Sequence, residues 1–192
     1  MKKKKILALI ETSLIAQQEI KISSLESENK FGFVIGYTDK YLLYQEVADF
    51  EFDGYTAIAI DKINKIESNL FRETTTRIMK LEGEMSKFGI TYDVDLTNWQ
   101  TIFESIKKEK AFSIVEGIDK KGELFSIGKI GEIKQKKVEL IDFDANGVYY
   151  KYPSIIKYKH IIQVRFDNRY VNVFQKHAHF EENEAAEVVV KP

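Results

Sequence analysis

The sequence predicts an α+β protein that is mainly β, with two tandem small five-stranded barrels, an N-terminal helix and a helical connector. Three observations support this fold class. Alternating apolar residues mark short strands in two separate regions, turn signals separate these strands, and apolar residues at helical spacing mark the segments outside them. Hydrophobic residues make up 44% of the 192 residues, which is enough to build packed cores.

The N-terminal helix is expected over residues 1–18. Ile6, Ile10 and Leu14 recur at helical spacing, so one face of this helix is apolar. A basic cluster precedes Ile6, as in a targeting signal, but the apolar run stops at Glu11 and no small-residue cleavage site follows. We therefore expect a cytoplasmic protein without stable membrane insertion.

The first barrel is expected over residues 19–76. Apolar residues alternate over 31–37 and resume at 41–44, which indicates a strand, a tight connection and a second strand. Asp53 and Gly54 form a turn signal, and further alternation follows it. Short curved strands avoid open edges by closing, so a closed barrel is the expected arrangement.

Residues 77–110 are expected to form the helical connector. Trp99 begins an apolar stripe typical of a buried helical face, and Thr97 with Gln100 matches a capping box. The preceding helix is expected to bury one face that consists of Ile78, Leu81 and Met85.

The second barrel is expected over residues 111–180. Its clearest strands are 112–118, 124–133 and 138–143. The segment around His177 is interpreted as a strand, where two histidines could take up metal only adventitiously. Residues 181–192 are rich in glutamate, so an acidic, flexible tail is expected there.

The two predicted barrels share landmarks in the same order, which indicates a duplication. The offsets between matched positions vary from 91 to 99 residues, as expected if the loops differ in length. The matched landmarks are Gly32 with Gly128, Gly54 with Gly147, Ile63 with Ile161, and Asn69 with Asn168.

This order of glycine, short strand, acidic turn and final I-x-x-[IV] resembles the Sm-like barrels of LSm proteins and bacterial Hfq. The whole chain also resembles a group of uncharacterised bacterial proteins in which two such units flank helices. The segment from Tyr158 to Ile162 is similar to the Y-K-H-x-I segment of Hfq. That similarity implies that Lys159 and His160 line an RNA-base pocket, once per chain, because the first unit has Asp61 and Lys62 there.

The second unit is locally basic, although the whole chain has a formal net charge of -1. Residues 145–178 contain six Lys and Arg against a single Asp, with aromatic residues between them. Bases stack on aromatic rings while cations neutralise phosphates, so this composition suits single-stranded nucleic acid. The candidate nucleic-acid-binding residues are Lys157, Tyr158, Lys159, His160, Arg165 and Arg169.

A purely structural role remains the alternative for these residues. Strand alternation places about half of the aromatic residues in the core. His160 could pack at a strand end with a backbone partner instead of binding a base.

Composition and motifs argue against an enzyme. The absence of Cys excludes disulfides, Cys-ligated zinc and a thiol nucleophile, and the common catalytic motifs are missing. We expect no catalytic residues, no metal site and no cofactor.

The expected function is a non-catalytic bacterial binding or scaffold protein. RNA or single-stranded nucleic-acid binding through the second barrel is the first alternative. The second alternative is an immunity or regulatory protein that binds another protein. A homo-oligomer is also possible in principle, because edge strands can pair between subunits.

Overall fold

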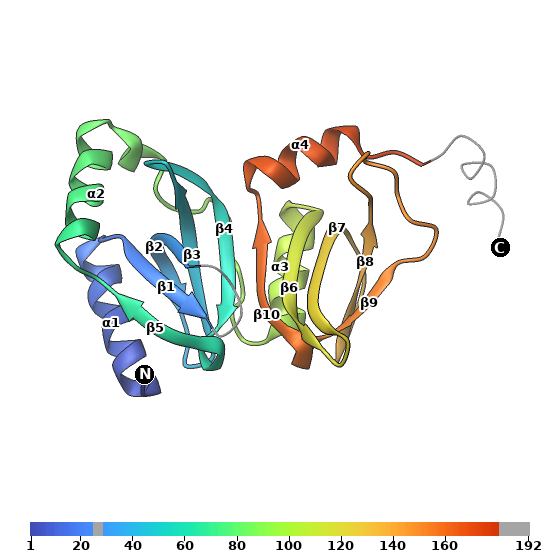
Figure 1. Ribbon diagram of the computed structural model, residues 1–192, viewed down its shortest axis with the longest axis horizontal. Coiled ribbons are helices and arrows are strands. Elements are labelled where there is room, and N and C mark those ends of the chain that lie inside the picture. Colours follow the sequence, from blue (N-terminus) through green and yellow to red (C-terminus); the bar gives the residue numbers. More distant parts are fainter. Residues whose placement is uncertain (25–28, 181–192) are drawn as a thin grey trace.

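The computed structural model describes residues 1–24 and 29–180 and confirms an α+β protein that is mainly β (Figure 1). Its strands form a ten-stranded antiparallel sheet with the order β5-β1-β2-β3-β4-β10-β6-β7-β8-β9. The strands are β1 (Ile20–Ser24), β2 (Lys30–Tyr37), β3 (Tyr41–Ala48), β4 (Glu51–Ala59), β5 (Ile63–Glu67), β6 (Phe112–Asp119), β7 (Gly122–Lys134), β8 (Lys137–Asp142), β9 (Ser154–Lys157) and β10 (Ile161–Phe166). The α-helices of the described part are α1 (Lys3–Ala16), α2 (Leu70–Leu81), α3 (Trp99–Glu109) and α4 (Arg169–His177). Its 3₁₀ turns are η1 (Ile60–Lys62), η2 (Glu84–Lys87) and η3 (Tyr158–His160). The tail predicted at 181–192 lies outside the described residues.

The order of elements is repeated in the two halves of the chain. Each half has a helix, four strands, a 3₁₀ turn, a fifth strand and a further helix, so α1 corresponds to α3 and α2 to α4. Asn69 and Asn168 hold equivalent positions, because the side chain of each accepts backbone hydrogen bonds at the start of its helix. The repeated order agrees with the predicted duplication and extends it to the helices.

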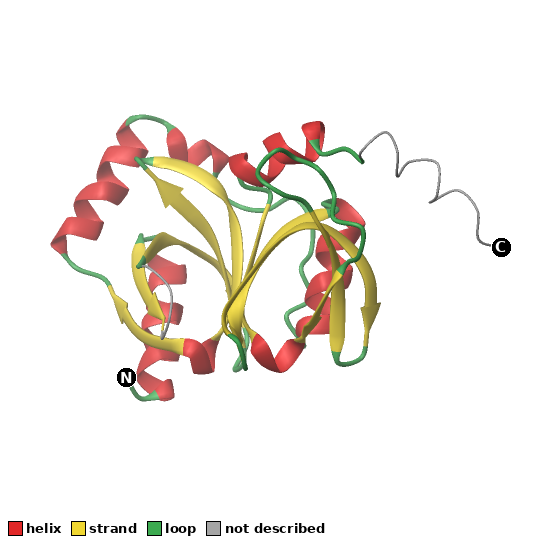
Figure 2. Ribbon diagram, turned by 45° about the vertical axis from the view of Figure 1, so that its right-hand side comes forward, coloured by secondary structure: helices red, strands yellow, loops and turns green. Residues whose placement is uncertain are grey.

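The two halves share one sheet because β4 pairs with β10. The backbone register of this seam runs from Gln163 opposite Ile58 to Phe166 opposite Tyr55. The strands of each half curve strongly (Figure 2), but among the described residues the sheet remains open and ends at β5 and β9. The predicted closure of each half into a barrel is therefore wrong. In a closed barrel, β4 and β10 would each pair within their own half. Here they pair with each other across the seam, so neither strand has an open edge.

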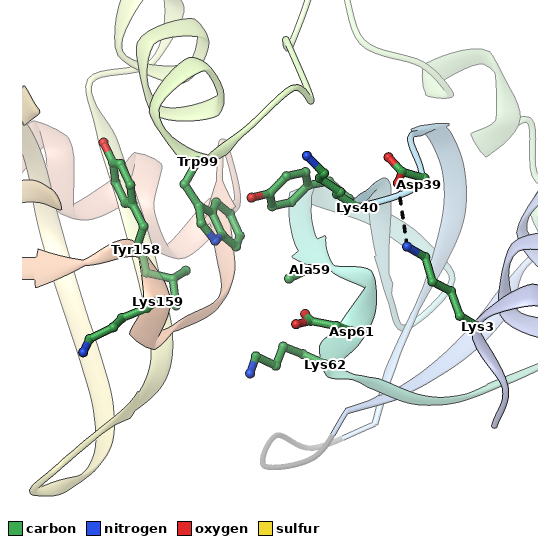
Figure 3. Close-up of a pocket in the computed structure, with 11 residues that line it drawn as sticks. Lys3, Asp39, Lys40, Ala59, Asp61, Lys62, Trp99, Tyr158 and Lys159 are labelled. Atoms are coloured by element: carbon green, nitrogen blue, oxygen red, sulfur yellow. Dashed lines mark ion pairs between the residues drawn. The ribbon is translucent and has the colours of Figure 1, made fainter. Parts of the chain in front are cut away.

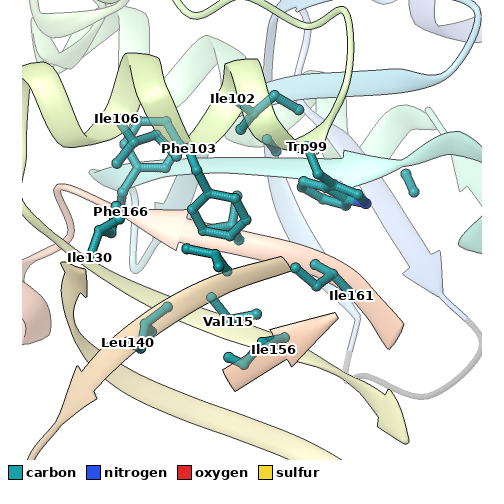
Figure 4. Packing of buried hydrophobic residues seen from close by; sticks show 14 of the residues in the cluster. Trp99, Ile102, Phe103, Ile106, Val115, Ile130, Leu140, Ile156, Ile161 and Phe166 are labelled. Carbon is teal, nitrogen blue, oxygen red and sulfur yellow. The ribbon is translucent and has the colours of Figure 1, made fainter. Parts of the chain in front are cut away.

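Each half has its own hydrophobic core beneath its first helix. Ile6 and Ile10 of α1 pack into the first core, which confirms the predicted N-terminal helix. Trp99 opens the apolar face of α3 and is only 6% exposed, as its spacing predicted (Figure 4). Neighbouring residues on a strand point to opposite sides, so Ile58 of β4 joins the first core and Ala57 joins the second.

The buried face of α2 differs from the prediction. Leu81 is 73% exposed, and the buried residues of the helix are Arg72, Thr75, Thr76 and Met79. Arg72 Nη1 lies 2.9 Å from Oε2 of the buried Glu19, and the Thr76 hydroxyl accepts the Glu19 backbone N–H at 3.0 Å. These polar contacts fix the orientation of α2, and apolar spacing cannot reveal them.

Two further local predictions are corrected. The capping box of α3 consists of Asn98 and Thr101, one residue later than the predicted pair of Thr97 and Gln100. His177 is the last residue of α4, so the strand expected there is wrong. The helix is amphipathic and packs its apolar side against the outer face of the second half. The residues at its end alternate as in a strand, so the sequence pattern there did not indicate a helix.

Candidate nucleic-acid interface

The structure does not bring the six predicted nucleic-acid-binding residues together on one surface. They are Lys157 at the end of β9, Tyr158, Lys159 and His160 in η3, Arg165 in β10 and Arg169 at the start of α4. The connection from β9 to β10, which contains η3, lies at one end of the second half, and α4 lies across the other (Figure 1).

Tyr158 and His160 are half-buried and make contacts within the protein. The Tyr158 ring stacks on Phe103 with their centroids 6.0 Å apart, and its hydroxyl donates to the Lys134 carbonyl at 2.8 Å. Burial raises the pKa of Tyr158 to about 12, so this hydroxyl remains a donor near neutral pH. Nδ1 of His160 lies 2.9 Å from the Ile118 carbonyl, to which it donates. Both side chains therefore have the structural role that the sequence analysis gave as the alternative to nucleic-acid binding.

Arg165 belongs to a charged network at the seam. Its Nε lies 2.8 Å from Oε1 of Glu46, and Nη1 lies 3.8 Å from Oε1 of Glu116. The Thr56 hydroxyl also donates to Glu46, and the Gln163 amide donates to Glu116. Burial alone would lower the pKa of Arg165, but the two carboxylates outweigh burial and raise it. Because its charge is neutralised within the fold, Arg165 is poorly placed to contact a phosphate.

Arg169 lies in a different groove. Its backbone N–H donates to Oδ1 of Asp53 at 2.6 Å, which joins the start of α4 to β4 of the first half. The groove has a volume of about 470 Å³ and is lined by Asp53, Arg169, Tyr170, Val173 and Phe174. Arg169 is therefore separated from the η3 residues.

Lys157 and Lys159 belong to a basic cavity that the sequence identified only in part. This cavity has a volume of about 550 Å³ and is called the lysine groove. It is lined by Gln135, Lys136, Lys137, Lys157, Tyr158 and Lys159. Lys136 lies in the tight connection between β7 and β8, and Lys137 is the first residue of β8. Their position in the basic run at 134–137 was the signal that could have identified them.

The strand register places two lysines of the groove directly opposite each other. Lys137 at the start of β8 pairs with Lys157 at the end of β9. Like charges in this position repel and destabilise a sheet. Within the described residues neither makes an ion pair, whereas the neighbouring Lys134 lies 2.6 Å from a Glu132 carboxylate oxygen. The groove thus concentrates positive charge that a bound anion would neutralise.

A second cavity adjoins the groove on the other side of η3 and lies between the two halves (Figure 3). We call it the seam cavity; its volume is about 520 Å³ and it shares Lys159 with the groove. Its other charged lining residues are Lys3, Lys40, Lys62, Asp39 and Asp61. The rings of Trp99 and Tyr41, whose centroids lie 4.9 Å apart, provide an apolar wall.

A cluster of polar side chains crosses three strands near the start of β9. Asp142 of β8 accepts hydrogen bonds from the hydroxyls of Ser126 in β7 and Ser154 in β9. Asp142 is 7% exposed, and burial raises the pKa of its carboxyl because these two hydroxyls only partly replace water.

Stability is expected to depend on pH through Asp142. Between the ordinary pKa of this carboxyl and its raised value, the folded protein holds a proton that the unfolded chain releases. The contribution of Asp142 to the free energy of unfolding therefore falls as pH rises through this interval and is constant above it. Urea unfolding from about pH 4 to 7 should show this fall in the wild type relative to Asp142→Asn. Parallel curves for the two proteins would contradict the assignment.

Comparison with protein-family models, curated proteins and solved structures found no match. Residues 1–24 and 29–180 contain no group of three or more His, Cys, Asp or Glu residues arranged to hold a metal ion. None of the helices in this part combines the length and the apolar character needed to cross a bilayer.

Proposed function

We propose that the protein is a non-catalytic binding protein that holds single-stranded nucleic acid in the lysine groove and the seam cavity. The observation that carries this proposal is the opposed pair of Lys137 and Lys157, a repulsion that a bound phosphate would relieve. Across the two cavities, the described lining contains seven lysines and two aspartates. Such a surface attracts a phosphate backbone whatever its sequence.

The proposal includes the resemblance to Sm-like proteins. The strand order β5-β1-β2-β3-β4 recurs as β10-β6-β7-β8-β9, which supports two related five-stranded units. The Hfq-like segment at η3 lies between the two cavities and contributes Lys159 to both. We propose that the chain is a bacterial, cytoplasmic protein with tandem Sm-like units, and the repeated strand order supports this proposal.

The two ends of the sheet favour a second candidate function. As far as the described residues extend, β5 and β9 each pair with one neighbouring strand, and Ile155 of β9 is 56% exposed. An edge of this kind can accept a strand from another protein or from a second copy of the chain. A regulatory or immunity protein would use such a contact.

Removal of Lys157 is expected to weaken nucleic-acid binding while leaving the fold intact. Lys157→Ala should lower affinity for a labelled uridine oligonucleotide of about twelve nucleotides and reduce the slope of log affinity against log salt by about 0.7. Its free energy of unfolding should rise by about 0.2–1 kcal/mol, because Lys137 loses a repelling neighbour. Fluorescence anisotropy from about 50 to 200 mM salt measures the slope.

Lys108→Ala is the matched control, because the Lys108 side chain lies on α3 with 82% of its surface exposed and lines neither cavity. It should leave the salt slope unchanged. Equal slopes for the two variants would contradict the lysine groove. Absence of binding at low salt, together with a protein that co-purifies in stoichiometric amount, would favour the second candidate.

A further inference from the structure

The strand β9 connects the lysine groove to another cavity that has no role in the function proposed above. Lys157 at the end of β9 lines the groove, and Ser154 at its start lines a cavity of about 390 Å³. This cavity lies among β7, the end of β8 and the start of α4. Its volume is within the range of small-molecule sites.

Three exposed aromatic side chains line this cavity. The exposed fractions are 63% for Phe125, 54% for Tyr150 and 55% for Tyr170. The Tyr150 backbone N–H donates to the Asp142 carbonyl at 2.9 Å. The ring centroids of Tyr170 and Phe174 lie 4.9 Å apart. The backbone of Tyr150 and the ring of Tyr170 are therefore anchored. Exposed aromatic faces are the surfaces on which nucleic-acid bases stack.

Hydrogen-bond acceptors line the same cavity. Ser126, Asp142 and Ser154 contribute to its lining and form the cluster described above. A carboxylate has about four acceptor positions, and the two serine hydroxyls occupy two of them. A ligand that presents adjacent N–H donors would complete the set. Guanine has this pattern, because its N1–H and its N2 amino group lie on one edge.

We propose that this cavity, the base pocket, binds a guanine of the same strand whose phosphates occupy the lysine groove. The inference rests on the proposed function and adds base preference to it. Ser154 and Lys157 are three positions apart on β9, which is about 10 Å along a strand. This distance corresponds to about three nucleotides at the spacing of a stacked strand. Ser154 and Lys157 point to opposite sides of the sheet. Because β9 is the last strand of the sheet, one oligonucleotide that passes around its open edge can reach both sites.

The test compares uridine oligonucleotides of about twelve nucleotides that carry one central guanosine, inosine or adenosine. Inosine retains N1–H but lacks the N2 amino group, so it isolates the second donor. We expect wild-type protein to bind the guanosine probe about tenfold more tightly than the adenosine probe, with inosine between them. Asp142→Asn should bring the guanosine-to-adenosine ratio close to one.

Phe125→Ala keeps the proposal falsifiable if Asp142→Asn does not fold, because Phe125 is a mainly exposed side chain. It should weaken binding of the guanosine probe about tenfold. Tyr152→Ala is the matched control, since Tyr152 is 76% exposed and lies outside the lining of both sites. Its guanosine-to-adenosine ratio should equal that of the wild type.

The outcomes separate the base pocket from the lysine groove. Equal affinity for the three probes, with a salt slope that still depends on Lys157, would overturn the base pocket and leave the proposed function standing. A guanosine preference that survives both Asp142→Asn and Phe125→Ala would also overturn the pocket, because the preference would arise elsewhere. If no probe binds at low salt, both proposals fail.

Discussion

Replacement of Arg165 by methionine should lower the free energy of unfolding by about 3–5 kcal/mol. The side chain is 19% exposed and neutralises Glu46 and Glu116 at the seam between the two halves. Methionine would leave the Glu46 carboxylate, which is 9% exposed, with Thr56 as its remaining close donor. A buried charge that loses its counter-charge is among the most destabilising changes in a protein core. Urea unfolding followed by circular dichroism measures the loss.

A second substitution separates charge from packing. Glu46→Gln in the Arg165→Met background removes the stranded carboxylate, so it should recover at least about 1 kcal/mol of the loss. No recovery would show that the network does not act through charge. Where Arg165→Met remains folded, its salt slope for nucleic acid should match the wild type. A reduced salt slope would show that Arg165 contributes to nucleic-acid binding.

The fold class and the strands were predictable because their signals are local. The strand predicted over 112–118 corresponds to β6 (Phe112–Asp119), and the spacing of Ile6 and Ile10 corresponds to α1. The joining of β4 to β10 was not predictable, because the seam depends on long-range partners such as Arg165 and Glu46, which are 119 residues apart. Alternation shows that a strand has two faces, but not which strand lies beside it.

The candidate site was only partly predictable for a similar reason. Local charge identified Lys157 and Lys159, and both line the lysine groove. The same count included Arg165, because a sequence does not show that two glutamates from other strands neutralise it. It omitted Lys137, which register alone places opposite Lys157. A run of charged residues in the sequence predicts a charged binding surface only when the fold brings those residues together at the same place.

Gly32→Ala and Gly128→Ala should each lower the free energy of unfolding by about 1–3 kcal/mol or more. These glycines were matched between the halves on sequence, and the structure gives them the same environment. A Cβ at Gly32 would overlap the carbonyl oxygen of Gln45, and one at Gly128 would overlap that of Ile141. Both obstacles are backbone atoms of the neighbouring strand, so rotation of a side chain cannot relieve them.

The two effects should be similar in size, because Gln45 follows Gly32 by the same interval that separates Ile141 from Gly128. Gly36→Ala is the matched control, since no atom outside its chain neighbours lies within 4 Å of a Cβ there. We expect it to leave stability unchanged or to raise it by up to about 1 kcal/mol, through the smaller entropy of the unfolded chain. Chemical denaturation of the three variants tests the comparison. If Gly32→Ala and Gly128→Ala were as stable as Gly36→Ala, the close approach of neighbouring strands would not be what requires glycine in each half.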